Sequence, residues 1–407
     1  MIKIHLFQAG YGDSFLVQLS PDTESEINIM IDCGFGYKEN ILPKLKAVLG
    51  KDKKIDRFII THYDADHING AILFFKDNGK SEDAKIVKVD QVWLNTYRHL
   101  QFHKREDGLV NYADGKKIEA YIASCKSKER VNIEGEIGAL QATTLGAELL
   151  KNGYNWNSDS QENAISIDYV SIINLGNNAS IQLLNPNNQN LKLLETDFLV
   201  DLARAGLKPK DDELFDDAFE FYSLSEEKAE RILEEGTISS SDVVISKEFI
   251  QNCSENVEYI PDNSSANGSS IAFILNQGEK RLLFLGDANS EDIINAVVSI
   301  RKREENYPLF FDAIKVSHHG SFRSSGSELF KYIDSGKFIF STNGKHPKHT
   351  HPDIETIACI INRQLSEGIE RRELIFNYEL DHLRGLYDES LQNDFKYDIK
   401  VEEHISL

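Results

Sequence analysis

Long apolar runs are missing from this sequence of 407 residues. No stretch approaches the roughly 18 apolar residues that a membrane-spanning helix requires. The first residues, MIKIHLFQ, include Lys3 and His5, whereas a signal peptide has an uninterrupted apolar segment. We therefore expect no membrane segment and a cytoplasmic location.

Cysteine and positive charge are also scarce. The four cysteines, Cys33, Cys125, Cys253 and Cys359, lie far apart and form no CxxC pair, which argues against a disulfide framework or a cysteine zinc site. Lys and Arg number 45 against 66 Asp and Glu, which gives a net charge of −21. Such a field disfavours docking of duplex DNA on a basic face, but not an enzyme that contacts nucleic acid through metal ions.

Short apolar runs alternate with helical patterns at both ends of the chain. No repeat of fixed period is visible, which excludes solenoids and propellers. We predict a single α/β domain over 1–407, an αββα four-layer sandwich in which helices cover two packed sheets. VSIINLG and ASIQLLNP, joined by GNN, predict a β-hairpin. We interpret 97–156 as an insertion and 191–262 as an acidic helical insertion, either a surface for a protein partner or a solvated face.

The strongest motif is THYDADH, residues 61–67, on the turn that leaves the buried run IDRFII. It places four potential metal ligands within six positions: His62, Asp64, Asp66 and His67. Crowded carboxylates are costly unless cations neutralise them, and a pair of divalent ions would do so. Helix capping by an aspartate is the alternative, but it leaves both histidines unexplained. By contrast, QAGYGDS, with Asp13, predicts a tight turn and not a nucleotide loop.

THYDADH resembles the HxHxDH motif of the metallo-β-lactamase superfamily, with Asp64 in place of the second histidine. The HxDxDH version is similar to the nuclease-like domain of ComEC-type DNA-uptake proteins. Further blocks of that subgroup are present in order along the chain: FQAGYGDSFLV with MIDCG before this motif, and LFLGD, KVSHHGS and STNGKHPKHTHPD after it. The resemblance covers both ends of the chain and fails over most of 97–262.

The resemblance implies roles for individual residues. His62 and Asp64 would bind one metal, Asp66 and His67 the other, and Asp287 of LFLGD would bridge them. The superfamily's third-motif histidine is absent, and Asn267, Ser269 or Ser270 stands in its place. His318 and His319 would each be a metal ligand or the acid that protonates the leaving oxygen. In the last block we prefer His351 as a ligand over His346 and His349. Asp32 of MIDCG would orient a ligand.

We therefore expect a binuclear metallohydrolase that holds two divalent ions, zinc or manganese, with Asp64 shifting the preference toward manganese. A hydroxide that bridges the ions would attack the substrate, and Asp66 would orient or deprotonate it. The resemblance favours a phosphodiesterase or nuclease that acts on nucleic acid or nucleotides. Two alternatives stay open: a hydrolase of small esters, lactones or amides, and a metal-stabilised, non-catalytic partner protein.

Overall fold

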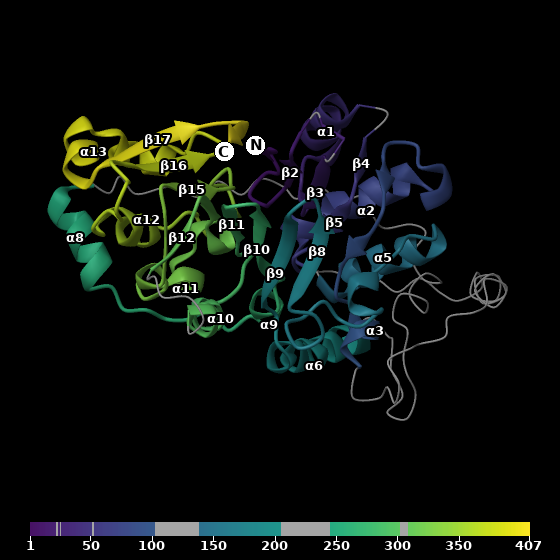
Figure 1. The fold of residues 1–407 in the computed structure, drawn as a ribbon. Coiled ribbons are helices and arrows are strands. Elements are labelled where there is room, and N and C mark those ends of the chain that lie inside the picture. The colour runs from purple at the N-terminus through teal and green to yellow at the C-terminus, as the bar shows by residue number, and fades with distance from the viewer. Residues whose placement is uncertain (22, 25, 51–52, 102–137, 205–244, 302–307) are drawn as a thin grey trace.

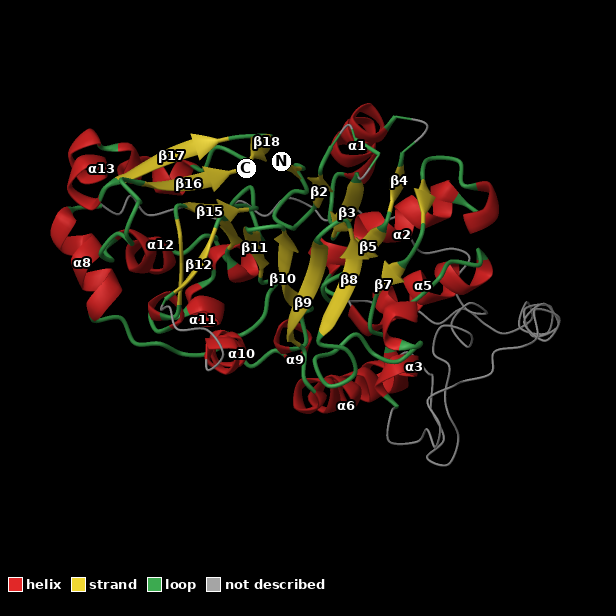
Figure 2. Ribbon diagram, viewed as in Figure 1, coloured by secondary structure: helices red, strands yellow, loops and turns green. Residues whose placement is uncertain are grey.

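The computed structural model describes residues 1–407 except residues 22, 25, 51–52, 102–137, 205–244 and 302–307. Two β-sheets pack against each other at the centre, and helices cover their outer faces (Figures 1 and 2). The predicted αββα four-layer sandwich is therefore confirmed, and it is the fold that the sequence resemblance implied.

The first sheet has six strands in the order β18-β1-β2-β3-β5-β7. They are β1 (Ile2–Leu6), β2 (Phe15–Leu19), β3 (Ile27–Ile31), β5 (Arg57–Ile59), β7 (Val92–Trp93) and β18 (His404–Ser406). A small parallel pair, β4 (Lys54–Ile55) and β6 (Lys88–Val89), lies beside it. In β3, Ile29 and Ile31 face the second sheet while Met30 faces the helices, because successive strand residues point to opposite sides.

The second sheet has eight strands in the order β17-β16-β15-β13-β11-β10-β9-β8. They are β8 (Ile172–Gly176), β9 (Ala179–Asn185), β10 (Ala272–Gln277), β11 (Lys280–Phe284), β13 (Ala313–Lys315), β15 (Lys337–Phe340), β16 (Arg372–Phe376) and β17 (Tyr397–Val401). A parallel pair, β12 (Leu309–Phe311) and β14 (Ile333–Ser335), flanks it. The predicted hairpin is β8-β9, whose turn residues Asn177 and Asn178 have φ of 52° and 58°, as Asn tolerates in a tight hairpin turn.

Helices shield each sheet on its outer side. Those packed on the first sheet or near its end are α1 (Leu42–Leu49), α2 (Ala65–Asn78), α3 (Tyr97–Leu100), α5 (Gly138–Lys151), α6 (Asn188–Arg204) and α9 (Ser265–Gly268). Those on the side of the second sheet are α8 (Lys247–Glu255), α10 (Ser290–Arg301), α11 (Phe322–Ser325), α12 (Ile354–Ile361) and α13 (Glu389–Phe395). The inner faces of the two sheets bury a third apolar core.

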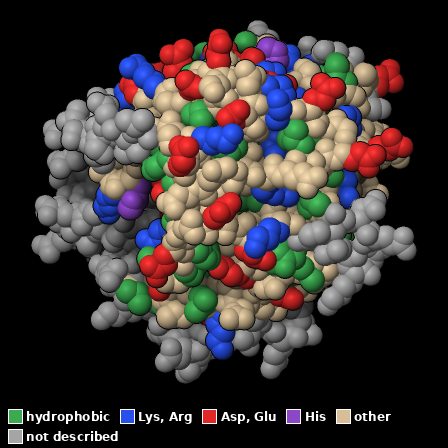
Figure 3. Space-filling view, turned by 90° about the vertical axis from the view of Figure 1, so that its left-hand side faces the viewer, with side chains coloured by type: hydrophobic (Ala, Val, Ile, Leu, Met, Phe, Trp, Pro, Cys, Tyr) green, Lys and Arg blue, Asp and Glu red, His purple; other side chains and the backbone are tan. Residues whose placement is uncertain are grey.

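The outer surface is mixed in charge. On the face that carries α8, α12 and α13, acidic and basic side chains are interspersed, and apolar ones are scattered among them (Figure 3). Among the described residues, no helix combines the length and the apolar character needed to cross a bilayer. Much of the two predicted insertions, residues 102–137 and 205–244, lies outside the described residues.

Parallel strands position the candidate site. β3 and β5 run parallel in the first sheet, and β11, β13 and β15 run parallel in the second. The carboxyl ends of parallel neighbours meet at one edge of a sheet, so the segments that follow these strands lie close together. These segments contain Asp32, the THYDADH motif, Asp287, the histidine pair at 318–319 and Thr342.

Candidate metal centre

Helix α2 begins earlier than the sequence pattern indicates. Asp64 has an extended backbone (φ −66°, ψ 146°) and immediately precedes the helix, which starts at Ala65. Asp66 and His67, predicted on the turn, therefore lie in the first turn of α2. This rigid start directs the His67 side chain into the protein, where it is fully buried.

Asp32 fixes the orientation of His67. Its carboxylate accepts hydrogen bonds from the backbone N–H and the hydroxyl of Thr61, both at 2.7 Å. It also lies 2.9 Å from Nδ1 of His67. With Nδ1 engaged, Nε2 of His67 is the nitrogen that faces the site, an arrangement common for metal-binding histidines. This is the orienting role expected for Asp32.

Asp287 lies at the centre of the site. Its Oδ2 is 3.4 Å from Nε2 of His67, 3.7 Å from Nε2 of His318 and 3.8 Å from Nε2 of His62 and of His319. One carboxylate oxygen surrounded by four imidazole nitrogens at these distances suits a ligand that bridges two ions. The structure places Asp287 among the histidines of the site, and its bridging role stays a prediction.

Unpartnered buried atoms show that a cation fits here. Nε2 of His62, Nε2 of His67 and Oδ1 of Asp287 are buried and have no hydrogen-bond partner. Leaving such an atom unsatisfied costs about 1–3 kcal/mol. Candidate ligand atoms of these three residues all lie within 4.8 Å of one another, so a single metal ion can contact them together.

Asp66 and His319 form the second half of the cluster. Nε2 of His319 is 3.0 Å from Oδ2 of Asp66, and its Nδ1 lies 2.8 Å from the carbonyl oxygen of Ser341. Oδ2 of Asp66 is 3.7 Å from Nε2 of His67. Asp64 is less enclosed, with 40% of its side chain exposed, and its Oδ2 is 3.7 Å from Nε2 of His62. Both carboxylates of the motif thus approach its histidines.

A strained turn aims the histidine pair inward. After β13, His318 and His319 both adopt the left-handed conformation, with φ of 47° and 54°. Such backbone conformations are unfavourable for residues other than Gly and cluster at functional sites. Gly320 follows with φ 93°, and a Cβ there would lie 2.4 Å from the Cβ of Pro352. The turn therefore requires glycine at 320, whereas the strained conformations of His318 and His319 point to a role in the site.

A buried ion pair lies directly behind the cluster. Lys315, the last residue of β13, pairs with Asp13 and donates to the carbonyl of Gly286 at 3.1 Å. Its Nζ is 3.8 Å from Oδ1 of Asp287. Asp13, His67 and His319 also form a compact group of potential ligand atoms. Because Lys315 already neutralises Asp13, we interpret Asp13 as a counter-ion and not as a metal ligand.

The electrostatics favour cations throughout the cluster. Burial opposes the protonation of His67, but the carboxylates of Asp287, Asp66 and Asp32 raise its pKa well above the ordinary value. Burial likewise opposes the charged form of His319, yet Asp13 and Asp287 raise its pKa to about 10. Protons therefore occupy these nitrogens where a divalent ion would otherwise bind.

Asp262 is a further residue of the site that the sequence did not single out. Its Oδ2 is 2.6 Å from Nδ2 of Asn267 and 3.5 Å from Nδ1 of His318, which also lies 2.9 Å from the hydroxyl of Ser324. Burial opposes the ionisation of Asp262, but hydrogen bonds from His318 and Asn267 hold the pKa of this carboxyl well below its usual range. Oδ1 of Asn267 is buried without a partner, near the position predicted for the missing ligand.

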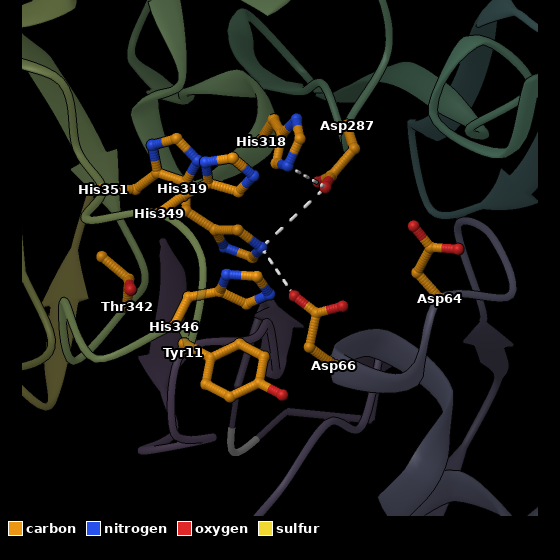
Figure 4. A pocket seen from close by; sticks show the side chains of 10 residues that line it. All are labelled: Tyr11, Asp64, Asp66, Asp287, His318, His319, Thr342, His346, His349 and His351. Atoms are coloured by element: carbon orange, nitrogen blue, oxygen red, sulfur yellow. Dashed lines mark hydrogen bonds and ion pairs between the residues drawn. The ribbon is translucent and has the colours of Figure 1, made fainter. Parts of the chain in front are cut away.

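The cluster opens into a cavity of about 90 Å³ (Figure 4). Its lining residues are Tyr11, Asp64, Asp66, Asp287, His318, His319, Thr342, His346, His349 and His351. His351 lies beside His318, with ring centroids 5.3 Å apart, and its Nδ1 is 3.2 Å from Asp353. The cavity lining therefore includes all three histidines of the last block, whereas His62 and His67 lie beneath it.

Comparison with known proteins gives one family match and several distant structural likenesses. A sequence model of the metallo-beta-lactamase superfamily matches residues 8–119. No curated protein matches the chain in sequence. Among solved structures, the metallo-beta-lactamase fold protein YhfI from Bacillus subtilis is 10% identical, with full coverage of both chains and a TM-score of 0.37. Zn2+-bound PqqB from Methylobacterium extorquens is also 10% identical, with full coverage of both chains and a TM-score of 0.39.

These two likenesses are too distant to carry over an activity. The superfamily match spans the opening turn, Asp32 and the complete THYDADH motif. The remaining cluster residues come from later segments, which the αββα fold brings to the same edge. The match to the metallo-beta-lactamase superfamily thus covers residues 8–119, and the segments that complete the cluster lie outside it.

Proposed function

We propose that the protein is a binuclear metal-dependent phosphodiesterase, similar in its site to the nuclease-like domain of ComEC-type proteins. The observation that carries this proposal is the composition of the cavity wall. Among the described residues that line it are carboxylates, imidazoles, Thr342 and Tyr11, and none with an aliphatic side chain. Pockets for acyl groups are mostly apolar, whereas a compact anion such as a phosphate suits a polar wall and two cations.

The residues that would hold the ions are those closest to Asp287. In the arrangement that the resemblance implies, His62 and Asp64 would hold one ion and Asp66 and His67 the other, with Asp287 shared; His62, His67 and Asp287 are also close enough to contact one ion together. His318, His319 and His351 complete the two coordination spheres or act on the substrate. Bound divalent ions would supply Lewis acidity and lower the pKa of water to near neutrality. The oxygen-rich set is compatible with manganese as well as zinc.

The protein's own groups have separate tasks in this proposal. Asp32 holds His67 in one orientation, and Asp66 orients the attacking water through Oδ2. His319 shares a hydrogen bond with that same oxygen, at 3.0 Å, and holds the Asp66 carboxylate in position. His318 is the more accessible of the pair, with 25% of its side chain exposed against 4% for His319. We therefore assign to His318 the contact with the leaving oxygen.

Matched chromogenic substrates test the proposal. Bis(4-nitrophenyl) phosphate, 4-nitrophenyl acetate and a chromogenic lactone are assayed with manganese, with zinc and with EDTA. We expect turnover of the phosphodiester with a divalent ion and loss of that turnover in EDTA. Hydrolysis of the acetate or the lactone alone would establish a small-molecule esterase instead. A metal-loaded protein that turns over none of the three would favour the non-catalytic alternative.

A further inference from the structure

One wall of the cavity takes no part in the cluster around Asp287. Thr342, His346 and His349 lie across the cavity from Asp64, and Tyr11 lies beside Asp66 (Figure 4). None of these four residues is among the ligands that we propose for the two ions. This wall therefore remains for contact with a substrate.

Hydrogen bonds keep the loop 342–349 of this wall in place. The backbone N–H of Asn343 donates to the carbonyl of Gly10 at 2.9 Å, and that of Thr342 donates to Oδ1 of Asn377 at 3.1 Å. The backbone N–H of Lys348 donates to Nδ1 of His346 at 3.2 Å. Because Nδ1 accepts, a neutral His346 ring carries its proton on Nε2. His346 thus has one N–H donor left for a group bound in the cavity.

Positive charge gathers on the same loop. Lys345 and Lys348 are exposed, and neither forms an ion pair with any described residue. A neighbouring turn touches the loop at Gly344, and its Asp381 is already paired with Arg384 at 2.6 Å. Although the chain carries a net charge of −21, charges farther away than about 8 Å are largely screened at physiological ionic strength. The local field is thus set by nearby groups, which include these lysines and the cavity carboxylates Asp64, Asp66 and Asp287.

We propose that Lys345, His346 and Lys348 form a second phosphate-binding subsite beside the metal cleft. This subsite binds the phosphate adjacent to the scissile one, so the substrate class is a single-stranded oligonucleotide. The inference rests on the proposed phosphodiesterase function and specifies its substrate.

The ring of His346 and the ammonium groups of Lys345 and Lys348 are the kinds of group that bind a phosphate. A neutral imidazole N–H contributes a directed hydrogen bond, and lysines contribute point charges that tolerate a flexible strand. Burial lowers the pKa of His346 to about 4, so its ring stays neutral at neutral pH. A cavity of about 90 Å³ suits a compact group such as a phosphoryl. An extended single strand can present successive phosphates to the cavity and the loop without the bulk of a second strand.

The double variant Lys345→Ala/Lys348→Ala tests this inference. The kcat/KM is measured for a short single-stranded DNA oligonucleotide and for bis(4-nitrophenyl) phosphate, which has a single phosphate. In the variant, the ratio of the first value to the second should fall about tenfold at low salt. Binding of a fluorescently labelled oligonucleotide is measured in parallel by anisotropy, in EDTA. There the slope of log Kd against log salt should decrease by about 1.4, since each phosphate contact contributes about 0.7 for a single strand.

The variant Lys46→Ala/Lys76→Ala is the matched control. It removes the same charge from exposed, unpaired lysines on α1 and α2 and should leave both readouts near the wild-type values. An unchanged ratio and salt slope in Lys345→Ala/Lys348→Ala, or changes equal to those of the control, would overturn the subsite. If the wild type cleaves neither substrate, the phosphodiesterase proposal fails. The binding of the labelled oligonucleotide, measured by anisotropy in EDTA, then tests the subsite independently of catalysis.

Discussion

Asp32 acts on the candidate metal centre directly through His67 and, by way of the Thr61 hydroxyl, through His62. It contacts His67 at Nδ1, on the side away from Asp287, and its own backbone adopts φ 55°. Asn tolerates that left-handed conformation and has nearly the same shape, so Asp32→Asn should fold. Its neutral amide should hold His67 less firmly and lower zinc and manganese affinity about 10- to 100-fold. Titration against a chelating indicator measures this, and wild-type affinity in a folded variant would show that Asp32 does not support the ligand.

The buried pair Asp13–Lys315 links the site to stability. Burial opposes ionisation of Asp13, but Lys315 and His319 lower its pKa to about 2. The stability from its ionised form is complete above the usual carboxyl pKa of about 4. This contribution is then lost as the pH falls through the lowered pKa.

Lys315→Met leaves Asp13 buried without its main cation, so we expect a loss of about 3–5 kcal/mol in the free energy of unfolding at pH 7. Denaturant unfolding measures this loss. The wild type should lose its advantage over the variant as the pH falls from about 4 to 2. The double variant Asp13→Asn/Lys315→Met, which removes both charges, should recover much of the stability at pH 7. A single variant as stable as the wild type would contradict the role of the pair.

At the scale of single elements, the turn Ser317–Gly320 sets the position of both site histidines. Gly320→Ala introduces a Cβ within 2.4 Å of Pro352 at a φ of 93°. We expect a loss of about 1–3 kcal/mol in stability and a larger loss of metal affinity, because the turn must shift. Thermal unfolding and metal titration of the same preparation separate the two effects. If metal affinity stays at the wild-type level while stability falls, the turn can shift without moving the histidines.

The positions of strands and turns can be predicted from the sequence where neighbouring residues are enough to indicate them. Apolar runs such as IDRFII and the turn pair Asn177–Asn178 are sufficient to predict β5 and the β8-β9 hairpin. The start of α2 is missed because polar residues Asp64–Asp66 conceal the onset of helical periodicity. Lys315 and Asp13 are missed because their pairing is non-local, although a lone lysine in the apolar strand FDAIKV is a signal. Asp262 is missed because its partner at the site, His318, is brought to it only by the fold.

At the scale of the whole molecule, the acidic segment 205–244 lies in the sequence between α6 and α8, and both helices pack into the apolar cores. α6 contributes Leu191, Leu194 and Phe198 to the first core, and α8 contributes Ile250 to the second. Replacement of 205–244 by a Gly/Ser linker should therefore preserve folding and the turnover of a small phosphodiester. Loss of the acidic residues should increase activity on long single-stranded DNA at low salt, and high salt should remove the gain.

Steady-state kinetics with both substrates at two salt concentrations measure this effect. The linker variant retains Asp262, which contacts His318 and is needed at the site. A folded, metal-loaded variant without small-substrate turnover would show that the segment supplies part of the active site. A variant whose turnover of long DNA equals that of the wild type at both salt concentrations would show that the acidic charge does not control access.

The central claim is that the cluster around Asp287 holds two divalent metal ions. Elemental analysis of the gently purified wild-type protein, expressed as moles of each metal per mole of chain, tests it most directly. We predict up to two ions per chain, with manganese or zinc dominant, and a clear loss of metal in Asp287→Ala, which removes the shared carboxylate. A protein that contains only magnesium or no metal, or an Asp287→Ala variant with wild-type metal content, would contradict the account.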